Sequence, residues 1–233
     1  YIGSHTVRLL RDAGYDVVVY DSLYRGRVEN TLGAPLVVGD IRDRNLVAQT
    51  CREYSVDAVV HFAALKSVGE SMSQPDLYWS NNVQGTVDLL EGIIAGIPDP
   101  ASRRIVFSSS AAVYGSPTRL PINEDSPLRP ENVYAETKAT MERLISWYGI
   151  THGVNWASLR YFNAAGASVD GLIGEDWSHT TNLIPQVMKA VLGAGPAVTV
   201  FGDDFDTIDG TGVRDYVHVH DLAEACLLYT SPS

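Results

Sequence analysis

Two side chains that can take part in proton transfer lie four residues apart in Tyr134-Ala-Glu-Thr-Lys138. On a helix this spacing places Tyr134 and Lys138 one turn apart on the same face. A phenol has an ordinary pKa of about 10, and a neighbouring ammonium together with a bound organic cation would lower that value. Tyr134 could then exchange a proton with a substrate hydroxyl near neutral pH. The spacing is common by chance, so its meaning depends on its position.

The pair opens an expected helix that follows an expected strand ending at Ser108-Ser109-Ser110. Parallel sheets bind ligands beyond the carboxyl ends of their strands. Ser110 could therefore hydrogen-bond the same substrate oxygen as Tyr134. The alternative interpretation is a polar strand end without a chemical role.

Two aspartates also follow expected strands. Asp21 could accept hydrogen bonds from the ribose hydroxyls of an adenine dinucleotide and repel a 2′-phosphate, or it could simply end its strand. Asp40 could accept from an adenine amino group, or it could cap the helix expected near residue 45. Gly3 would be the last glycine of a phosphate-binding loop that opens a helix.

The last third of the chain offers polar side chains of a different kind. The Arg214 guanidinium could bind a diphosphate through two parallel hydrogen bonds, or it could form a surface pair with Asp215. Asn163 is expected to face the same crevice as Ser110. His218 and His220 flank a valine and could share a strand face, but no third ligand suggests a metal.

Strands and helices must alternate to position these groups. Short β-branched runs followed by helical patterns predict a parallel sheet covered by helices on both faces. The expected strands are residues 15–21, 36–38, 57–62, 104–109 and 155–161, and the expected helices are residues 1–13, 45–54, 78–94 and 134–148.

The alternation stops after residue 162. Residues 166–212 are rich in Gly, Pro, Asp and Thr, which predicts an irregular second lobe with one helix at 183–192. We expect a main domain over 1–162 and part of a smaller lobe over 163–233, with 213–228 returning to the main domain. A final helix over 221–228 should be broken at Tyr229. The sequence opens inside a helix, so we also expect a fragment without its first strand.

Composition narrows the possible partners. The formal net charge is −11 and the pI about 4.8, which disfavours nucleic acid. Two cysteines suit a reducing, cytoplasmic location, and no apolar run has the length of a membrane span.

Ten stretches distributed along the chain are informative in combination: YIGSH, GDIRD, VVHFAALKSVGES, NNVQGT, FSSSAAVYG, YAETK, LRYFNAAGA, NLIP, VFG and DGTGVRDYVHVHDLAEA. Together they resemble the extended short-chain dehydrogenase/reductase family, and within it the branch of the UDP-glucose 4-epimerases. The similarity runs through nearly the whole chain in family order. It implies a Rossmann-type, doubly wound parallel sheet with a smaller, irregular substrate-binding lobe.

The resemblance also implies residue roles. Tyr134 would be the catalytic base and acid, Lys138 its electrostatic partner and a ribose ligand, and Ser110 a second hydroxyl ligand. A UDP-sugar would be the substrate, and a homodimer is one assembly that the family suggests. NAD would be lined by Tyr1, Ile2, Gly3, Asp21, Ser22, Leu23, Tyr24, Arg25, Gly26, Asp40, Ile41, Phe62, Ala63, Ala64, Lys66, Asn82, Ser110, Tyr134, Lys138 and Phe162. The UDP-sugar would be lined by Ser110, Tyr134, Asn163, Asn182, Leu183, Val200, Phe201, Gly202 and Arg214.

Three activities remain open within this resemblance. The first is epimerisation at C4 of a UDP-hexose through a 4-keto intermediate, with NAD as a resident cofactor. The second is a nucleotide-sugar 4,6-dehydratase or decarboxylase, and the third is a non-catalytic NAD-binding protein. A non-catalytic NAD-binding protein would be expected to lack Tyr134 or Lys138, and this chain has both. A dehydratase should carry an Asp-Glu pair after Ser110, where this chain has Ala111-Ala112.

Overall fold

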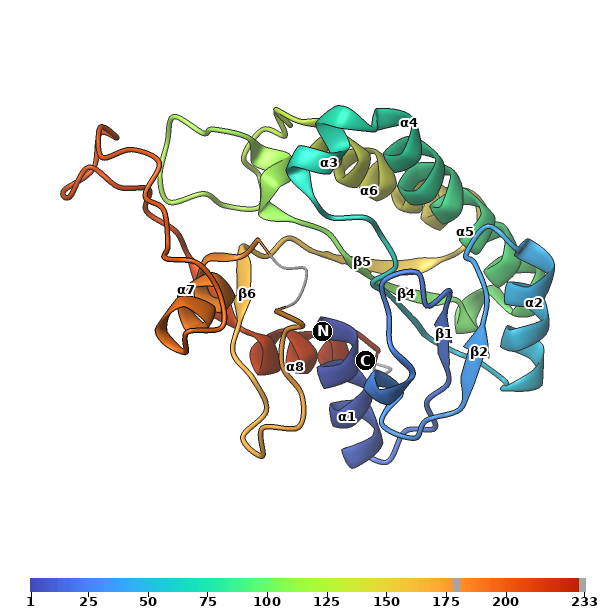
Figure 1. Cartoon of the computed structure of the whole chain (residues 1–233). Helices are drawn as coiled ribbons and strands as arrows, with labels where there is room; N and C mark the ends of the chain where they lie inside the picture. The colour runs from blue at the N-terminus through green and yellow to red at the C-terminus, as the bar shows by residue number, and fades with distance from the viewer. Residues whose placement is uncertain (178–180, 231–233) are drawn as a thin grey trace.

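The computed structural model describes residues 1–177 and 181–230, in which parallel strands lie between two layers of helices (Figure 1). Every strand pairing in this part of the chain is parallel, as the sequence predicts. β1 pairs with β2, β3 and β5 flank β4, and β6 pairs with β7. The fold is therefore a Rossmann-type α/β fold. The strands are β1 (Val19–Asp21), β2 (Leu36–Val38), β3 (Val59–His61), β4 (Arg104–Ser108), β5 (Asn155–Leu159), β6 (Asn163–Ala165) and β7 (Tyr216–His218).

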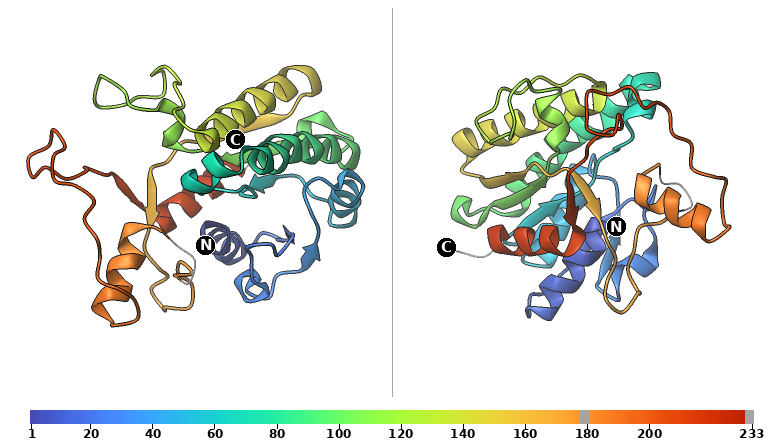
Figure 2. Two further views of the ribbon diagram at one scale, coloured as in Figure 1. Left: turned by 45° about the horizontal axis from the view of Figure 1, so that its top comes forward. Right: turned by 90° about the vertical axis from the view of Figure 1, so that its left-hand side faces the viewer.

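Helices cover both faces of the strands. The helices α2, α5 and α6 pack in one layer, while α8 lies on the opposite face against β3, β4 and α1 (Figures 1 and 2). This layering buries β4, the middle strand of its sheet, on both faces, so apolar residues run along it without alternation. The α-helices are α1 (Ile2–Asp12), α2 (Arg44–Glu53), α3 (Val68–Ser73), α4 (Pro75–Tyr78), α5 (Gly85–Gly96), α6 (Val133–His152), α7 (Leu183–Val191) and α8 (Val219–Thr230), and the shorter 3₁₀ helices are Val28–Thr31, Pro100–Ser102 and Ala111–Tyr114.

The main core lies between β4 and the helices α5 and α6. Ile105 and Phe107 of β4 are fully buried and cluster with Leu90 and Ile93 of α5 and with Met141 of α6. Burial of each such side chain contributes about 1.5–3 kcal/mol. This packing fixes the carboxyl end of β4, where the three serines lie, relative to the first turns of α6.

Three expected elements differ from the structure. The strand expected over 15–21 is only Val19–Asp21, because β2 pairs with just those residues. The helix expected over 78–94 is interrupted by a π-helical segment, Trp79–Gln84, between α4 and α5. The final helix does not break at Tyr229 but continues to Thr230, whose buried hydroxyl donates to the Leu227 carbonyl.

The irregular lobe returns to the main body through β6, β7 and α8, as Figure 2 shows. His218 ends β7 while His220 lies in α8, so the expectation that they share a strand face is wrong. In the described residues no group of three or more His, Cys, Asp or Glu side chains is arranged to hold a metal ion. No helix of that part is long and apolar enough to cross a membrane.

Candidate active site

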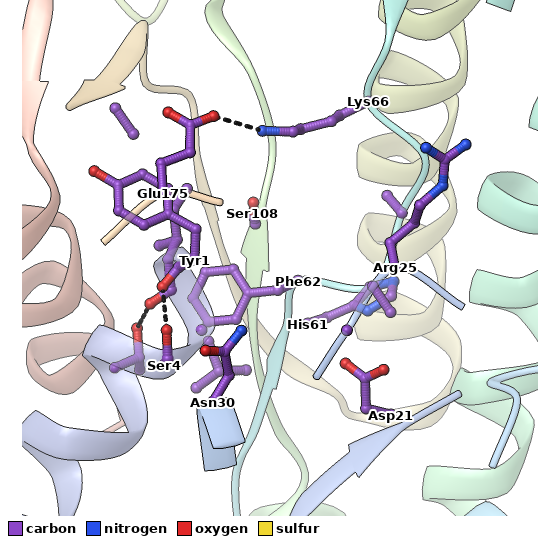
Figure 3. Close-up of a pocket in the computed structure, with 18 of the residues that line it drawn as sticks. Tyr1, Ser4, Asp21, Arg25, Asn30, His61, Phe62, Lys66, Ser108 and Glu175 are labelled. Carbon is purple, nitrogen blue, oxygen red and sulfur yellow. Dashed lines mark hydrogen bonds and ion pairs between the residues drawn. The ribbon is translucent and has the colours of Figure 1, made fainter. Parts of the chain in front are cut away.

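A single cleft collects almost all the predicted site residues. It has a volume of about 2580 Å³, lies beyond the carboxyl ends of β1, β3 and β4, and continues into the space between β1 and β3 (Figure 3). Asn82 is the exception, since it is fully buried and does not line the cleft. The predicted residues that line it are Tyr1, Ile2, Gly3, Asp21, Ser22, Leu23, Tyr24, Arg25, Gly26, Asp40, Ile41, Phe62, Ala63, Ala64, Lys66, Ser110, Tyr134, Lys138, Phe162, Asn163, Asn182, Leu183, Val200, Phe201, Gly202 and Arg214.

Tyr134 and Ser110 meet at the end of β4. The side chain of Asn132 caps α6 by accepting from the Ala135 amide at 2.9 Å, which places Tyr134 in the first turn facing the cleft. Burial raises the pKa of Tyr134, and a hydrogen bond with the Ser110 side chain opposes that rise. The protein groups alone thus keep the phenol protonated near neutral pH, and a cation beside it is what would favour the phenolate.

Lys138 lies one turn further along α6 and is 3% exposed. Its Nζ donates to the Ser108 carbonyl oxygen at 2.8 Å and lies 6.0 Å from the centre of the Tyr134 ring. Burial lowers the pKa of Lys138 to about 7, and the Glu142 carboxylate opposes that effect. The ammonium therefore titrates in the pH range in which an acid–base enzyme works.

Tyr161 is a cleft residue that was not among the predictions. Its hydroxyl is hydrogen-bonded to the Ser108 side chain, and burial raises its pKa. The signal that could have found it is its place directly after β5, the strand next to β4. Ser108 therefore joins Lys138 through its carbonyl oxygen and Tyr161 through its hydroxyl.

The amino end of α1 is suited to an anion. The helix begins at Ile2 without a side-chain cap and has no acidic residue in its first turn. Its free N–H groups and helix dipole favour a phosphate at this position. A Cβ at Gly3 would lie 3.4 Å from the ring of Phe62, the residue after β3, which is an ordinary packing distance. These residues fit the diphosphate of a dinucleotide.

Asp21 organises the loop that follows β1. Its carboxylate accepts from the Leu23 amide at 2.7 Å, and Gly26 lies so close that a side chain there would meet the same oxygen. Arg25 turns away to an ion pair with Glu70 at 2.9 Å. The carboxylate of Asp21 thus lies at the cleft edge where a ribose would bind, and Figure 3 shows it there.

Asp40 does not cap a helix. The cap of α2 is Asp43, which accepts from the Leu46 amide at 3.0 Å, so the capping alternative for Asp40 is wrong. Asp40 instead accepts from the Arg42 guanidinium at 2.6 and 2.9 Å, and these hydrogen bonds hold the pKa of its carboxyl below the ordinary value.

Asn82 supports the cleft from behind. Its side-chain amide donates to the Leu65 carbonyl at 3.0 Å and to Thr137 at 3.1 Å, and its oxygen accepts from the Leu65 amide at 2.8 Å. The π-helical turn in which it lies presents this side chain to the loop after β3. By holding the backbone of Leu65, Asn82 fixes the adjacent residues Ala64 and Lys66 in the cleft wall. Its own role toward NAD stays a prediction.

Polar side chains from the lobe form the other wall. Asn163 donates to the Asp215 carbonyl at 2.8 Å, and Asn182 donates to Glu175 at 2.6 Å. Arg214 donates to the Val213 carbonyl at 2.9 Å, and within residues 181–230 no ion pair joins it to Asp215. The alternative of a surface pair is therefore wrong, and the guanidinium lies along the cleft.

Ion pairs tie the segment 170–176 across the cleft to three parts of the main body. Glu175, which the sequence did not single out, lies 3.8 Å from Lys66 on the opposite wall (Figure 3). Asp170 pairs with Arg8 of α1 at 2.8 Å, and Asp176 pairs with Arg27. The pairs with Arg8 and Arg27 are partly exposed, and pairs of this kind each contribute at most about 1 kcal/mol.

The fold and the site define a nucleotide-binding enzyme of the extended short-chain dehydrogenase/reductase type. A model of the NAD dependent epimerase/dehydratase family matches residues 1–231, and the chain belongs to that family. The resemblance stated from the sequence is confirmed.

Several relatives are similar over most of this chain. It is 48% identical over 229 residues to a UDP-glucose 4-epimerase of Lactobacillus helveticus, a match that covers 98% of this chain and 68% of the relative. The UDP-glucose 4-epimerase of Brucella ovis, solved in complex with NAD, is 43% identical with a TM-score of 0.94, covering 99% of this chain and 70% of that one. The enzyme of Bifidobacterium longum, in complex with NAD⁺ and UDP, is 40% identical with a TM-score of 0.86, covering 97% and 70% of the two chains.

Proposed function

We propose that this chain carries the NAD-dependent epimerisation of a UDP-hexose at C4, interconverting UDP-glucose and UDP-galactose through a 4-keto intermediate. The observation that carries the proposal is the meeting of Tyr134, Ser110 and Lys138 at the carboxyl end of β4, inside the cleft. The 4-epimerase relatives at 45–48% identity support the same activity.

The chain's own residues move and hold the proton in this proposal. The Tyr134 phenolate accepts the proton of the sugar O4 and later returns it from the phenol, while Ser110 hydrogen-bonds the same oxygen. The charged Lys138 ammonium stabilises the phenolate before it takes the proton and after it has returned it, because opposite charges at this distance attract strongly in a buried site. Asn163, Asn182 and Arg214 would hold the nucleotide while the 4-keto sugar turns, so that either face of its C4 can meet the hydride donor.

NAD, when bound, would supply the acceptor and donor of the hydride that leaves and rejoins C4. The free N–H groups at the start of α1 would hold its diphosphate and Asp21 its adenosine ribose. Ser22 to Gly26, Asp40, Ile41, Phe62 to Ala64, Lys66 and Phe162 would line its remaining length.

The residues after Ser110 favour epimerisation over dehydration. Elimination of water across C5 and C6 needs an acid and a base beside the sugar. Ala111 and Ala112, which begin a short 3₁₀ helix there, can serve as neither. The downstream acids Glu124 and Asp125 do not line the cleft.

The test is to incubate the protein with NAD and UDP-glucose and follow the products by proton NMR. We expect the anomeric signal of UDP-galactose and its absence in the matched variant Tyr134→Phe. A methyl doublet from a 6-deoxy sugar, without a galactose signal, would refute epimerisation in favour of a 4,6-dehydratase. Loss of C6 as carbon dioxide, seen with a UDP-glucuronate substrate, would favour a decarboxylase.

The domain assignment belongs to the same proposal, with residues 1–162 binding NAD and residues 163–233 forming part of the substrate lobe. A cytoplasmic location, a homodimer and the lack of a nucleic-acid partner also stay predictions, drawn from composition and from the family.

A further inference from the structure

A buried carboxylate lies behind the catalytic groups and belongs to none of the roles described above. Glu142 is 5% exposed and follows Tyr134 and Lys138 at four-residue steps along α6, so the three side chains share a helix face. Its carboxylate accepts the hydrogen bond of the buried Ser109 hydroxyl. Glu142 therefore contacts the strand end between the two serines that bind Lys138 and Tyr134.

Arg160 holds this carboxylate in one orientation. Its guanidinium donates to both Glu142 oxygens, from Nε at 2.9 and 3.1 Å and from Nη2 at 2.7 Å. The second guanidinium nitrogen donates to the Tyr114 hydroxyl at 2.8 Å, and the guanidinium lies 5.2 Å from that ring. Such a bidentate geometry keeps the carboxylate of Glu142 directed toward Ser109.

Glu142 also supplies the charge that opposes the burial of Lys138. His61 on β3 is neutral there, because burial lowers its pKa to about 3, and the buried thiol of Cys226 on α8 is neutral because burial raises its pKa to about 11. Groups from several elements surround Lys138 and its immediate partners. From β4 these are the Ser108 carbonyl and the Phe107 ring, and from α6 itself they are Tyr134 and Glu142. The others are the His61 imidazole from β3, the Tyr161 hydroxyl after β5 and the Cys226 thiol from α8.

We propose that Glu142, oriented by Arg160, is a positioning residue that keeps Lys138 charged and the serine strand end in register for the reaction at Tyr134. The inference rests on the proposed function for its consequence on turnover, but the charge of Lys138 can be measured without any substrate. Lys66, Lys138 and Lys189 are the only lysines of the chain. Their ε-carbon signals in protein labelled with ¹³C-lysine are therefore simple to assign, with Lys138→Met as the reference.

The decisive variant is Glu142→Gln, which keeps the shape of the side chain and removes its charge. We expect the pKa of Lys138 to fall by about one pH unit, the smaller end of the effect of a neighbouring opposite charge. The charged fraction of Lys138 then drops about tenfold at pH 8 but less than about twofold at pH 6. Turnover should show the same pH dependence, and Glu142→Asp should restore most of it.

Two matched variants separate this effect from loss of structure. Arg160→Gln breaks the same ion pair but keeps the carboxylate, so it should not lower the pKa of Lys138. Glu136→Gln breaks an exposed pair with Arg143 on the same helix, 3.1 Å long, and should change neither readout. If Glu142→Gln is too unstable to study, the double variant Glu142→Gln/Arg160→Gln carries the test, because it removes the carboxylate without leaving the guanidinium unpaired. The pKa of Lys138 should be lower in the double variant than in Arg160→Gln alone, and an equal pKa in the two would overturn the inference.

An unchanged Lys138 titration in Glu142→Gln, or an equal fall in Glu142→Gln and Arg160→Gln, would overturn the inference. A loss of turnover equal at pH 6 and pH 8 would overturn it too, since a purely structural role predicts that result. Failure of the unmodified protein to form UDP-galactose would instead refute the proposed function, and the NMR titration would still decide the role of Glu142.

Discussion

Burial of the Lys138 ammonium should cost folding stability, and its removal should stabilise the protein while it abolishes the reaction. Burial lowers the pKa of Lys138 from 10.5 to about 7. At about 1.4 kcal/mol per pH unit, this difference corresponds to about 4–5 kcal/mol of destabilisation when the group is charged in both states. The cost is fully present below pH 7, diminishes as the pH rises above that value, and is lost at about 10.5, where the unfolded chain also releases the proton.

The variant Lys138→Met keeps the length and the apolar stem of the side chain. It leaves the Ser108 carbonyl without its donor, which costs about 1–3 kcal/mol. The free energy of unfolding at pH 7 should therefore increase by about 1–3 kcal/mol, and the gain should shrink by pH 9.5. Turnover should nevertheless fall about 100-fold or more, because the phenolate of Tyr134 loses its cation.

Urea unfolding followed by circular dichroism at pH 7 and pH 9.5 measures the stability, without NAD so that ligand binding does not contribute. The matched control is Lys66→Met, whose side chain is 70% exposed and whose removal should change the free energy of unfolding by about 0.5 kcal/mol or less. A Lys138→Met variant that is less stable than the parent at both pH values would refute the assigned cost of burial.

Three further predictions concern other parts of the molecule. Tyr134→Phe should lower turnover by roughly 10²- to 10⁴-fold and leave NAD bound, as measured by calorimetry; parental turnover would exclude Tyr134 as the base. Asp21→Ala should weaken NAD binding by about 10- to 100-fold and improve the relative binding of NADP, because the carboxylate no longer holds the ribose or repels a 2′-phosphate; an unchanged NAD/NADP ratio would contradict that assignment. Arg103→Met should lower the free energy of unfolding by about 3 kcal/mol, because the buried guanidinium satisfies the carbonyls of residues 97, 98 and 152 at 2.7–2.9 Å; a change below about 1 kcal/mol would show that water replaces it.

The parallel fold was predictable because the sequence signals are local. Apolar runs such as residues 104–108 can only be buried on both faces, and the following helices supply the cover. Tyr134, Lys138 and Ser110 could be placed together for the same reason, since the spacing on α6 and the carboxyl end of β4 are both properties of short segments. The cleft therefore contains nearly every residue that the motifs indicated.

The contacts that the sequence could not predict join segments distant in the chain. Glu142 reads as an ordinary helical carboxylate until Arg160, eighteen residues later, and Ser109, thirty-three residues earlier, are found beside it. The resemblance places Asn82 beside NAD, but in the structure its side chain is directed into the interior from the π-helical turn. The surroundings of both side chains depend on packing between elements, which the neighbouring sequence does not specify.

Packing between distant segments also holds the groups of the reaction centre in place at the carboxyl end of β4. Each serine of the run at the end of β4 is held by a different side chain of α6: Ser108 by Lys138, Ser109 by Glu142 and Ser110 by Tyr134. Ser108 is also hydrogen-bonded to Tyr161. A shift of β4 by one residue would break all of these contacts at once, because neighbouring side chains point in different directions. The buried ammonium opposes folding, and the hydrogen bonds of this serine run offset part of that cost. The arrangement therefore places a buried, destabilising charge at the position where the proposed chemistry needs a cation.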